Sequence, residues 1–504
     1  MSGISSNSVL VADGDLFAAL PGATAHGISY APAAIRAGAI AVLTDRAGAA
    51  ELPGLGSADV PVLVVTDPRA VLGELSAELY GHPARALRVL GVTGTSGKTT
   101  TTFLVRAGLE AAGISSGIVG TVGIFAGDVL VKTPFTTPEA PQLQGLLAVM
   151  RERDIECVAM EVSSHALRMG RVDGTEFAIG AFTNLSQDHL DFHSDMEDYF
   201  AAKALLFDGR ARREIVVVDD EWGRRLVTGN TVTVSTQADA DWRATDVTVM
   251  PDGSTRFTVH GPVRSFTAGC RIPGAYNVAN TLLAFAILSE SGVDAAAVAP
   301  AVAAAQVRGR MERVDGDQQF LAVVDYSHKP AGVAGALRAL RPLTAGRLIM
   351  VLGCGGDRDR GKRPVMGEVA ARNCDVLLIT DDNPRTEVPA EIRAAMLAGA
   401  RSVPADEAAE ILEVGNRRAA IAEALALAEP GDTVLIAGKG HETGQEIGGS
   451  ILPFDDVAVV RECLREQGFS VESAGGEISA TADGEISVTA DGDISATADV
   501  ETLR

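Results

Sequence analysis

A short segment rich in glycine, threonine and lysine has the clearest chemistry in the sequence. Residues 93–100 read Thr-Gly-Thr-Ser-Gly-Lys-Thr-Thr, directly after the apolar run 87–92 and before an amphipathic run. Glycines let backbone N–H groups close around a phosphate, a helix N-terminus favours the anion, and Lys98 adds a positive charge. Val92 stands where the strict phosphate-loop pattern has glycine. The order strand, turn, helix still predicts a loop that binds nucleotide phosphates.

Two residues near this loop are candidates for binding Mg²⁺. Thr99 directly follows the lysine, where a metal-binding hydroxyl is usual. Glu161 closes a predicted apolar strand, and a carboxylate there can hold Mg²⁺ beside a phosphate loop. A glutamate solvated at a strand end would be the simpler interpretation of Glu161 alone, but Lys98 and Thr99 favour the metal role.

Residues 183–193 bring aspartates and histidines together after another predicted strand. Such a cluster after a strand is one candidate for a functional loop. The alternative is a polar loop whose aspartates cap the next helix. His189 by itself does not distinguish the two.

Lys203 is the most unusual single residue. In the predicted helix 198–207, Phe200 and Phe207 lie three residues before and four residues after it, which places Lys203 on an apolar stripe. Lysine is uncommon there unless it is paired or modified. A snorkelling lysine at the edge of the stripe fits the pattern equally well.

Three loops in the last third of the chain combine acidic and cationic residues, at 353–364, 381–387 and 438–442, and the first and third also contain glycine. Each follows a predicted strand, and ligands of open α/β sheets bind at the carboxyl ends of strands. Because the whole chain has a formal net charge of −23, cations concentrated in these loops indicate anionic small-molecule ligands. Solvated loops would explain any one of them but explain all three poorly.

The bulk composition limits the class of protein. A length of 504 residues favours about three domains. We expect a cytoplasmic protein without membrane insertion, because no apolar run reaches transmembrane length, no signal peptide is evident and the five cysteines are scattered. The negative charge argues against a nucleic-acid partner. We expect small-molecule substrates and a monomer.

The order of predicted elements indicates an α/β protein of three domains with a tail. We expect domains at 1–86, 87–313 and 314–468, the second with a mostly parallel sheet and a β-rich insertion at 243–269. The predicted strands of the two larger domains are 87–92, 155–162, 177–182, 215–218, 320–324, 348–352, 376–380 and 434–437, and an apolar helix is expected at 281–288. The tail, 469–504, contains three acidic octads (476–499). Because the octads are too short and too acidic to bury a core, we expect a disordered, solvated appendage without a catalytic part.

Together these motifs resemble those of the Mur ligases, and the resemblance covers nearly the whole chain, from Ser8 to about residue 465. The most specific matches are 93–100, 136–138, 160–165, 183–191, 309–312, 325–328, 353–364, 382–385 and 438–442. The resemblance implies an N-terminal UDP-binding domain, a central P-loop-type ATPase and a C-terminal Rossmann-like domain that holds the amino-acid site.

The resemblance also implies the reaction, that of family members which add meso-2,6-diaminopimelate. ATP phosphorylates the D-Glu γ-carboxylate of UDP-N-acetylmuramoyl-L-Ala-D-Glu (UDP-MurNAc-L-Ala-D-Glu). The amine of diaminopimelate attacks the resulting acyl phosphate, and phosphate leaves. Mg²⁺ is implied as cofactor, with two ions expected.

Site residues follow from the matching motifs. The catalytic set is Lys98, Glu161, His189 and Lys203, the last carbamylated in the family. Metal ligands are Thr99, Glu161, His189 and carbamylated Lys203. The ATP site comprises Gly94, Thr95, Ser96, Gly97, Lys98, Thr99, Thr100, Asn277, Arg310, Asp325 and His328. The UDP-sugar dipeptide matches Ser8, Thr136, Thr137, Ser163 and Arg171. The diaminopimelate pocket matches Arg358, Asp382, Asn383, Pro384, Arg385, Gly438 and Glu442.

Some positions depart from the family pattern. Val9 follows Ser8 where an arginine is usual, which leaves the uridine end least defined. Ser96, Met169, Ser327 and Lys329 are also unusual. The alternatives are a folylpolyglutamate synthase, which shares the ATPase core, a P-loop small-molecule kinase, and a non-catalytic nucleotide-binding scaffold.

Overall fold

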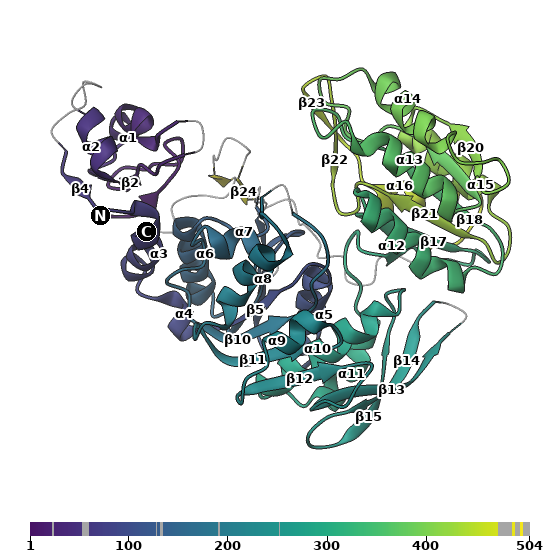
Figure 1. Cartoon of the computed structure of the whole chain (residues 1–504), viewed down its shortest axis with the longest axis horizontal. Coiled ribbons are helices and arrows are strands. Elements are labelled where there is room, and N and C mark those ends of the chain that lie inside the picture. Colours follow the sequence, from purple (N-terminus) through teal and green to yellow (C-terminus); the bar gives the residue numbers. More distant parts are fainter. Residues whose placement is uncertain are drawn as a thin grey trace.

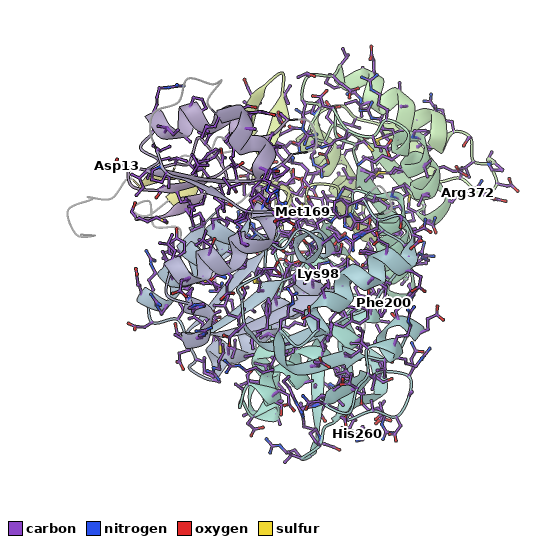
Figure 2. All side chains as sticks on the ribbon, turned by 60° about the vertical axis from the view of Figure 1, so that its left-hand side comes forward. Asp13, Lys98, Met169, Phe200, His260 and Arg372 are labelled. Carbon is purple, nitrogen blue, oxygen red and sulfur yellow. The ribbon has the colours of Figure 1, made fainter. Side chains whose placement is uncertain are left out.

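The structure, a computed structural model, describes residues 1–22, 25–52, 60–127, 129–131, 135–189, 192–250 and 253–471, and the backbone of strands 486–488 and 494–496. These residues form the three α/β domains expected, arranged in chain order with the central domain in the middle (Figure 1). Lys98 lies near the middle of the molecule, between Asp13 of the first domain and Arg372 of the third (Figure 2).

The N-terminal domain has a small parallel sheet in the order β1-β2-β3-β4. Its strands are β1 (Ile4–Ser5), β2 (Leu16–Ala18), β3 (Ala41–Thr44) and β4 (Val62–Val64). Its helices are α1 (Ala31–Arg36), α2 (Arg46–Glu51), α3 (Pro68–Leu79) and α4 (Pro83–Ala86). Asp67 caps α3, which leads the chain toward the central domain.

The central domain has an 11-stranded sheet in the order β15-β14-β13-β12-β11-β10-β5-β9-β6-β7-β8. The strands from β13 to β6 in this order are parallel, and the outer pairs are antiparallel. The bounds are β5 (Arg88–Thr93), β6 (Ser116–Gly120), β7 (Gly123–Ala126), β8 (Val129–Val131), β9 (Cys157–Glu161), β10 (Phe177–Phe182), β11 (Ala211–Val217), β12 (Thr231–Ser235), β13 (Trp242–Val249), β14 (Thr255–His260) and β15 (Ser265–Cys270).

Helices cover both faces of this sheet. They are α5 (Lys98–Ala111), α6 (Ala140–Glu152), α7 (Ser164–Arg168), α8 (Met196–Ala204), α9 (Glu221–Arg225), α10 (Tyr276–Glu290) and α11 (Ala295–Ala304). Strand β5 shows the arrangement, because Leu90 packs with α5 and α10 while Val89 packs with α6 on the other face. Burial on both faces explains why central strands read as continuous apolar runs.

The C-terminal domain has a six-stranded sheet in the order β16-β17-β21-β18-β19-β20, parallel except for β16. Its strands are β16 (Glu312–Arg313), β17 (Leu321–Asp325), β18 (Leu348–Leu352), β19 (Val376–Ile379), β20 (Glu410–Glu413) and β21 (Thr433–Ala437), and a hairpin follows as β22 (Gly444–Ile447) and β23 (Ser450–Pro453). Its helices are α12 (Pro330–Leu340), α13 (Lys362–Asn373), α14 (Pro389–Ala400), α15 (Arg417–Leu427) and α16 (Asp456–Glu466).

The predicted strands are confirmed, with shifted ends in several cases. The strands 177–182 and 348–352 have the expected bounds, whereas the strand expected at 155–162 is limited to β9 and that expected at 215–218 begins earlier, at β11. The helix expected at 281–288 extends to α10, and that expected at 198–207 is wrong in part, because α8 ends at Ala204 and a 3₁₀ turn follows over Leu205–Phe207. Strand β20 was not predicted, because its outer residues are glutamates.

The C-terminal domain continues slightly beyond the expected end at 468. Phe469 packs on Phe320 with ring centroids 5.9 Å apart, and Val471 pairs with Gly316. In the tail, the described residues form the antiparallel pair β24 (Ile486–Val488) and β25 (Ile494–Ala496). The other tail residues lie outside the described part, so the expected solvated appendage stays a prediction. Within the described part of the chain, no helix has the length and apolar character needed to cross a membrane.

Candidate functional site

The phosphate loop is formed by Gly94–Gly97 between β5 and α5. Gly94 (φ +141°) and Gly97 (φ +88°) both have left-handed backbone conformations that favour glycine. A Cβ on Gly94 would lie 1.9 Å from Thr183 Oγ1, and one on Gly97 would lie 2.3 Å from Asn280 Oδ1. The loop therefore requires glycine at both places for conformation and for space.

Two lysines converge on the loop. Lys98 Nζ donates to Gly94 O and Thr95 O, each at 2.9 Å, and Lys203 Nζ donates to the same Gly94 O at 2.7 Å. Lys203 also lies over the Tyr199 ring, 4.4 Å from its centroid. Lys203 is only 1% exposed, so the snorkelling interpretation of this residue is wrong. Its Nζ donates to a carbonyl oxygen and not to a carboxylate.

Burial affects the charge of both lysines. It lowers the pKa of Lys98, opposed by the carboxylate of Glu161. It lowers the pKa of Lys203 strongly, and the neighbouring charge of Lys98 adds to this effect. Since burial in a low dielectric disfavours the charged form, the surroundings of Lys203 favour its neutral amine more than water does.

Glu161 lies beside the loop at the end of β9 and is 1% exposed. It accepts hydrogen bonds from Thr99 Oγ1 at 2.9 Å, from Thr121 N at 2.8 Å and from Thr121 Oγ1 at 3.2 Å. A carboxylate and a hydroxyl in contact at a phosphate loop are hard oxygen ligands that suit Mg²⁺. In the described ranges, no three or more His, Cys, Asp or Glu side chains form a group that could hold a metal ion.

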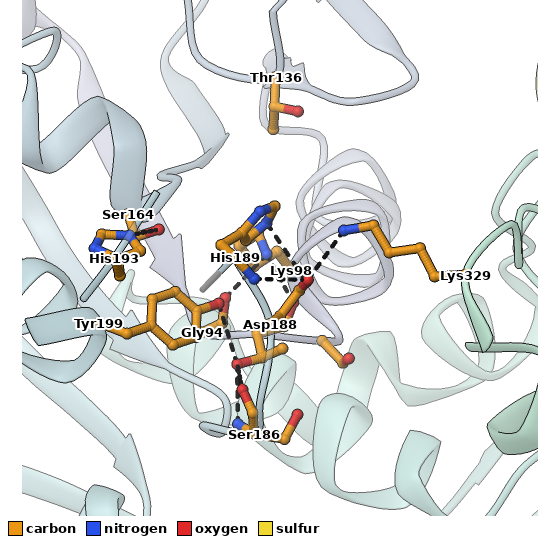
Figure 3. Close-up of polar contacts among 12 residues, drawn as sticks. Gly94, Lys98, Thr136, Ser164, Ser186, Asp188, His189, His193, Tyr199 and Lys329 are labelled. Atoms are coloured by element: carbon orange, nitrogen blue, oxygen red, sulfur yellow. Dashed lines mark hydrogen bonds and ion pairs between the residues drawn. The ribbon is translucent and has the colours of Figure 1, made fainter. Parts of the chain in front are cut away.

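His189 lies on the loop after β10, with φ +55°. Its ring is 4.9 Å from that of His165, and its Nε2 is 3.4 Å from Asp188 Oδ2 (Figure 3). Burial lowers the pKa of His189 to about 4, so the imidazole is neutral at neutral pH, as metal ligation requires. Asp188 does not cap the next helix, since Asp195 caps α8.

Sequence reasoning missed an ion pair between two domains at this point. Lys329 Nζ, from the C-terminal domain, lies 3.0 Å from Asp188 Oδ1 (Figure 3). In the sequence, Lys329 stands out only as a departure from the family pattern. Its partner, 141 positions away, could not be identified without the fold.

Four of the five residues matched to the UDP-sugar dipeptide lie close together around Glu161 and Thr121. Thr137 Oγ1 donates to Glu161 O at 2.9 Å and accepts from Ser163 N at 3.2 Å. Arg171 Nη1 donates to Thr137 O, and Thr136 Oγ1 lies 3.2 Å from Thr121 Oγ1. Ser8 lies after β1 in the N-terminal domain, and among the described residues no hydrogen bond or ion pair joins it to the other four.

Glu139 was also missed as a neighbour of this group. Its carboxylate lies 2.9 Å from Arg171 Nε and 3.2 Å from Arg69 Nη1. Arg69 belongs to α3, so this carboxylate links the N-terminal domain to the central one. No sequence signal indicates this link, because Glu139 and Arg69 are 70 positions apart.

The residues matched to the adenosine side form two groups. Arg310 lies over the Tyr326 ring at 4.6 Å, and His328 Nδ1 is 2.8 Å from Tyr326 O. Asp325 accepts from the backbone N–H groups of Met311 and Ser327, each at 2.8 Å. Asn277, in α10, accepts a hydrogen bond from Asn280, the residue that packs against Gly97.

Most residues matched to the acceptor pocket meet between the ends of β19 and β21. Asn383 Nδ2 donates to Glu442 Oε2 at 2.8 Å, and Asp382 Oδ2 would lie 2.5 Å from a Cβ on Gly438. Pro384 packs against Gly356 through its backbone. Lys439, which was not predicted, is fully buried and donates to Asn383 Oδ1 at 2.8 Å and Glu442 Oε2 at 3.1 Å.

Arg385 joins the edge of this pocket. Its Nη1 donates to Gly356 O at 2.7 Å and its Nε lies 2.9 Å from Glu446 Oε2. Arg385 has φ +54°, a conformation that its backbone pairing with β22 stabilises. Arg358 is exposed, and in the described part of the chain no hydrogen bond or ion pair joins it to these residues.

Comparison with known proteins matches each domain to a family model. "Mur ligase family, catalytic domain" matches residues 1–80, "Mur ligase middle domain" matches 92–288, and "Mur ligase, glutamate ligase domain" matches 309–440. The three matches follow the order of the domains in the fold.

Whole-chain relatives agree with these matches. UDP-N-acetylmuramoyl-L-alanyl-D-glutamate–2,6-diaminopimelate ligases of Streptomyces avermitilis and Streptomyces coelicolor are 53% and 54% identical over 474 residues, covering 92% of this chain and 93% of each relative. A solved structure of a ligase with the same name is 32% identical, with a TM-score of 0.66, and covers 93% of this chain and 95% of that one. With its phosphate loop, its fold and these relatives, the chain belongs to the Mur ligase family.

Proposed function

We propose that this protein is an ATP-dependent, amide-forming ligase of cytoplasmic peptidoglycan precursor synthesis. It joins meso-2,6-diaminopimelate to the D-Glu γ-carboxylate of UDP-MurNAc-L-Ala-D-Glu, with ADP and phosphate as the other products. The observation that supports this best is the convergence of Lys98 and Lys203 on Gly94 O beside the Thr99–Glu161 pair. The names of the relatives supply the substrates.

The geometry suggests how the nucleotide is held. Within the segment Gly94–Thr100, the N–H groups of Thr95 and Ser96 donate to Asn184, so the N–H groups at the start of α5 meet the ATP phosphates. Lys98 Nζ exchanges its two carbonyl acceptors for the β- and γ-phosphates. Asn277, Arg310, Asp325 and His328 hold the adenosine side. The γ-phosphoryl group then passes to the substrate γ-carboxylate, which gives an acyl phosphate and ADP.

The second half-reaction forms the amide. The amine of diaminopimelate attacks the acyl carbon, the C–O bond to phosphate breaks, and the amine loses a proton. The acceptor is held by Arg358, Asp382, Asn383, Pro384, Arg385, Gly438 and Glu442. The UDP-sugar dipeptide is held by Ser8, Thr136, Thr137, Ser163 and Arg171. These residues belong to domains 1–86 and 87–313, whereas the acceptor is bound by domain 314–468.

Lys203 is proposed to act as a carbamate. Its neutral amine adds to CO₂: the N–C bond forms, one C–O π bond of CO₂ breaks and one proton is released, so that a neutral amine becomes an anion. Thr99, Glu161, His189 and carbamylated Lys203 would hold Mg²⁺, with two ions expected. Bound Mg²⁺ would neutralise charge on the phosphates during transfer. The chain's own oxygen and nitrogen donors suit this role.

Phosphate release tests the proposal. Purified protein is incubated with ATP, Mg²⁺, UDP-MurNAc-L-Ala-D-Glu and one amino acid at a time, including meso-diaminopimelate and L-lysine. We expect phosphate only when all components are present, and most with meso-diaminopimelate. A product that retains the phosphate would indicate a kinase instead, and turnover with a folate acceptor would indicate a folylpolyglutamate synthase.

A further inference from the structure

A buried ion pair lies directly beneath the loops that form the proposed acceptor pocket. Arg417 and Asp456, the first residues of α15 and α16, have side chains that are 0% exposed. They make two parallel hydrogen bonds, Nε to Oδ1 at 2.8 Å and Nη2 to Oδ2 at 2.7 Å. Removal of one partner from such a pair leaves a buried charge uncompensated.

Arg417 also donates to backbone carbonyls at the ends of two separate strands. Nη2 also donates to Ala437 O at 2.9 Å, and Nη1 donates to Asp381 O at 3.5 Å. Ala437 is the last residue of β21 and precedes Gly438, whereas Asp381 follows β19 and precedes Asp382. One guanidinium therefore joins the starting points of the two loops 381–387 and 438–442.

The positive charge of Arg417 also interacts with carboxylates of these loops. Burial disfavours its charged form, but the attraction of Asp456 outweighs burial and raises the pKa of Arg417, with smaller contributions from Asp382 and Glu442. Both of these carboxylates belong to the proposed pocket. The cation thus offsets part of the negative charge that the pocket concentrates.

The residue before Asp456 contacts the connection between the central and C-terminal domains. This residue, Asp455, caps α16 and forms an ion pair with Arg308. Arg308 lies directly before Gly309, which packs against the backbone of Gly440 and His441. The segment that joins the two domains, the buried pair and the acceptor loops are therefore in continuous contact.

From these contacts we infer that Arg417 is a positioning residue that sets the separation of the two acceptor loops. This inference rests on the proposed function, because it takes the loops to bind the amino-acid acceptor. A planar guanidinium can hold a carboxylate through two donors and still reach two carbonyls, whereas an ammonium cannot reproduce that geometry. Arg417 touches no substrate in this account and acts through Asp382, Asn383, Gly438 and Glu442.

The test compares Arg417→Lys with Arg418→Lys. Arg418 is the next residue on α15 and pairs with Glu462 and Glu466 of the same helix α16, but it faces solvent. For Arg417→Lys we expect the KM for meso-diaminopimelate to rise about tenfold or more, while the KM for ATP stays within about twofold of wild type. Arg418→Lys should leave both constants unchanged.

Folding is followed separately by thermal melting and by binding of a fluorescent ATP analogue. If Arg417→Lys does not fold, Asp456→Asn provides the second variant, since an amide keeps the shape but weakens the grip on the guanidinium. A lowered Tm with an unchanged KM for the acceptor in every folded variant would overturn the inference and leave a purely stabilising pair. If wild-type protein releases no phosphate with any amino acid, the proposed function fails instead.

Discussion

Lys203 is the residue whose chemistry depends most on its surroundings. If it acts as a carbamate, Lys203→Ala should lose about 100-fold or more in kcat, the scale expected when metal coordination is disturbed. Millimolar formate or acetate should restore part of the activity by replacing the missing carboxylate. Phosphate release with and without the added acid is the measurement.

Lys203→Arg separates this role from that of a simple cation. Arginine keeps the positive charge but cannot form the carbamate, so it should be as inactive as the alanine variant and unresponsive to carboxylates. Thermal melting shows whether each variant folds, because the side chain is buried against Tyr199. Full activity of Lys203→Ala would contradict the carbamate.

Arg385 is the residue expected to select the acceptor. Lysine and meso-diaminopimelate differ by one carboxylate, which a guanidinium can grip with two hydrogen bonds. The bonds of Nε and Nη1 to Glu446 and Gly356 orient the group. A charged hydrogen bond contributes roughly 1.5–3 kcal/mol, so Arg385→Ala should lower kcat/KM for diaminopimelate about ten- to a hundredfold.

The KM for ATP should barely change in this variant. Arg372→Ala is a suitable control, because Arg372 is paired with Glu368 and Glu407 and lies at the outer edge of the molecule in Figure 2. Wild-type protein should hardly use lysine. Equal use of lysine and diaminopimelate by the wild type would refute the assignment of Arg385.

At the scale of elements, the connection before β16 is built to lie against the acceptor loop. Gly309 has φ +64°, and a Cβ there would lie 2.0 Å from His441 N and 2.2 Å from Gly440 C. Gly309→Ala should therefore destabilise the protein by about 1–3 kcal/mol. Because Arg310 directly follows Gly309 and Glu442 belongs to the loop that Gly309 contacts, the KM values for ATP and for the acceptor should both rise.

Gly113→Ala is the matched control for this substitution. Gly113 also has positive φ (+75°), but a Cβ there would meet nothing within 4 Å. Both variants place alanine at a positive φ, so the difference between their Tm values measures the effect of the backbone clash at residue 309 alone. Equal Tm values would show that the connection moves aside without effect.

At the scale of the whole molecule, the tail is expected to be dispensable. Its acidic octads lie beyond every motif of the family, so truncation after Val471 should leave turnover and Tm essentially unchanged. A shorter chain ending at Gly468 also loses Phe469 and Val471, which contact Phe320 and Gly316, and should melt at a lower temperature. Loss of activity on truncation after Val471 would show that the tail contributes to the body of the protein.

Features that depend on local order along the chain could be predicted without knowledge of the fold. The phosphate loop could be predicted because strand, glycine turn and helix follow one another within a few residues, and each step has a strong local preference. The buried strands could be predicted because parallel strands covered on both faces read as apolar runs. Strand β20, with glutamates at its ends, lacked that signal.

The pairs of distant side chains that meet could be identified only from the folded protein. Lys203 and Gly94 are 109 positions apart, and Arg417 and Asp456 are 39 apart. The sequence placed Lys203 on an apolar stripe but left open whether its ammonium reached solvent, because periodicity describes one helix and not what packs over it. Whether a lysine is solvated, paired or neutral depends on burial and on nearby charges, and both are properties of the packed fold.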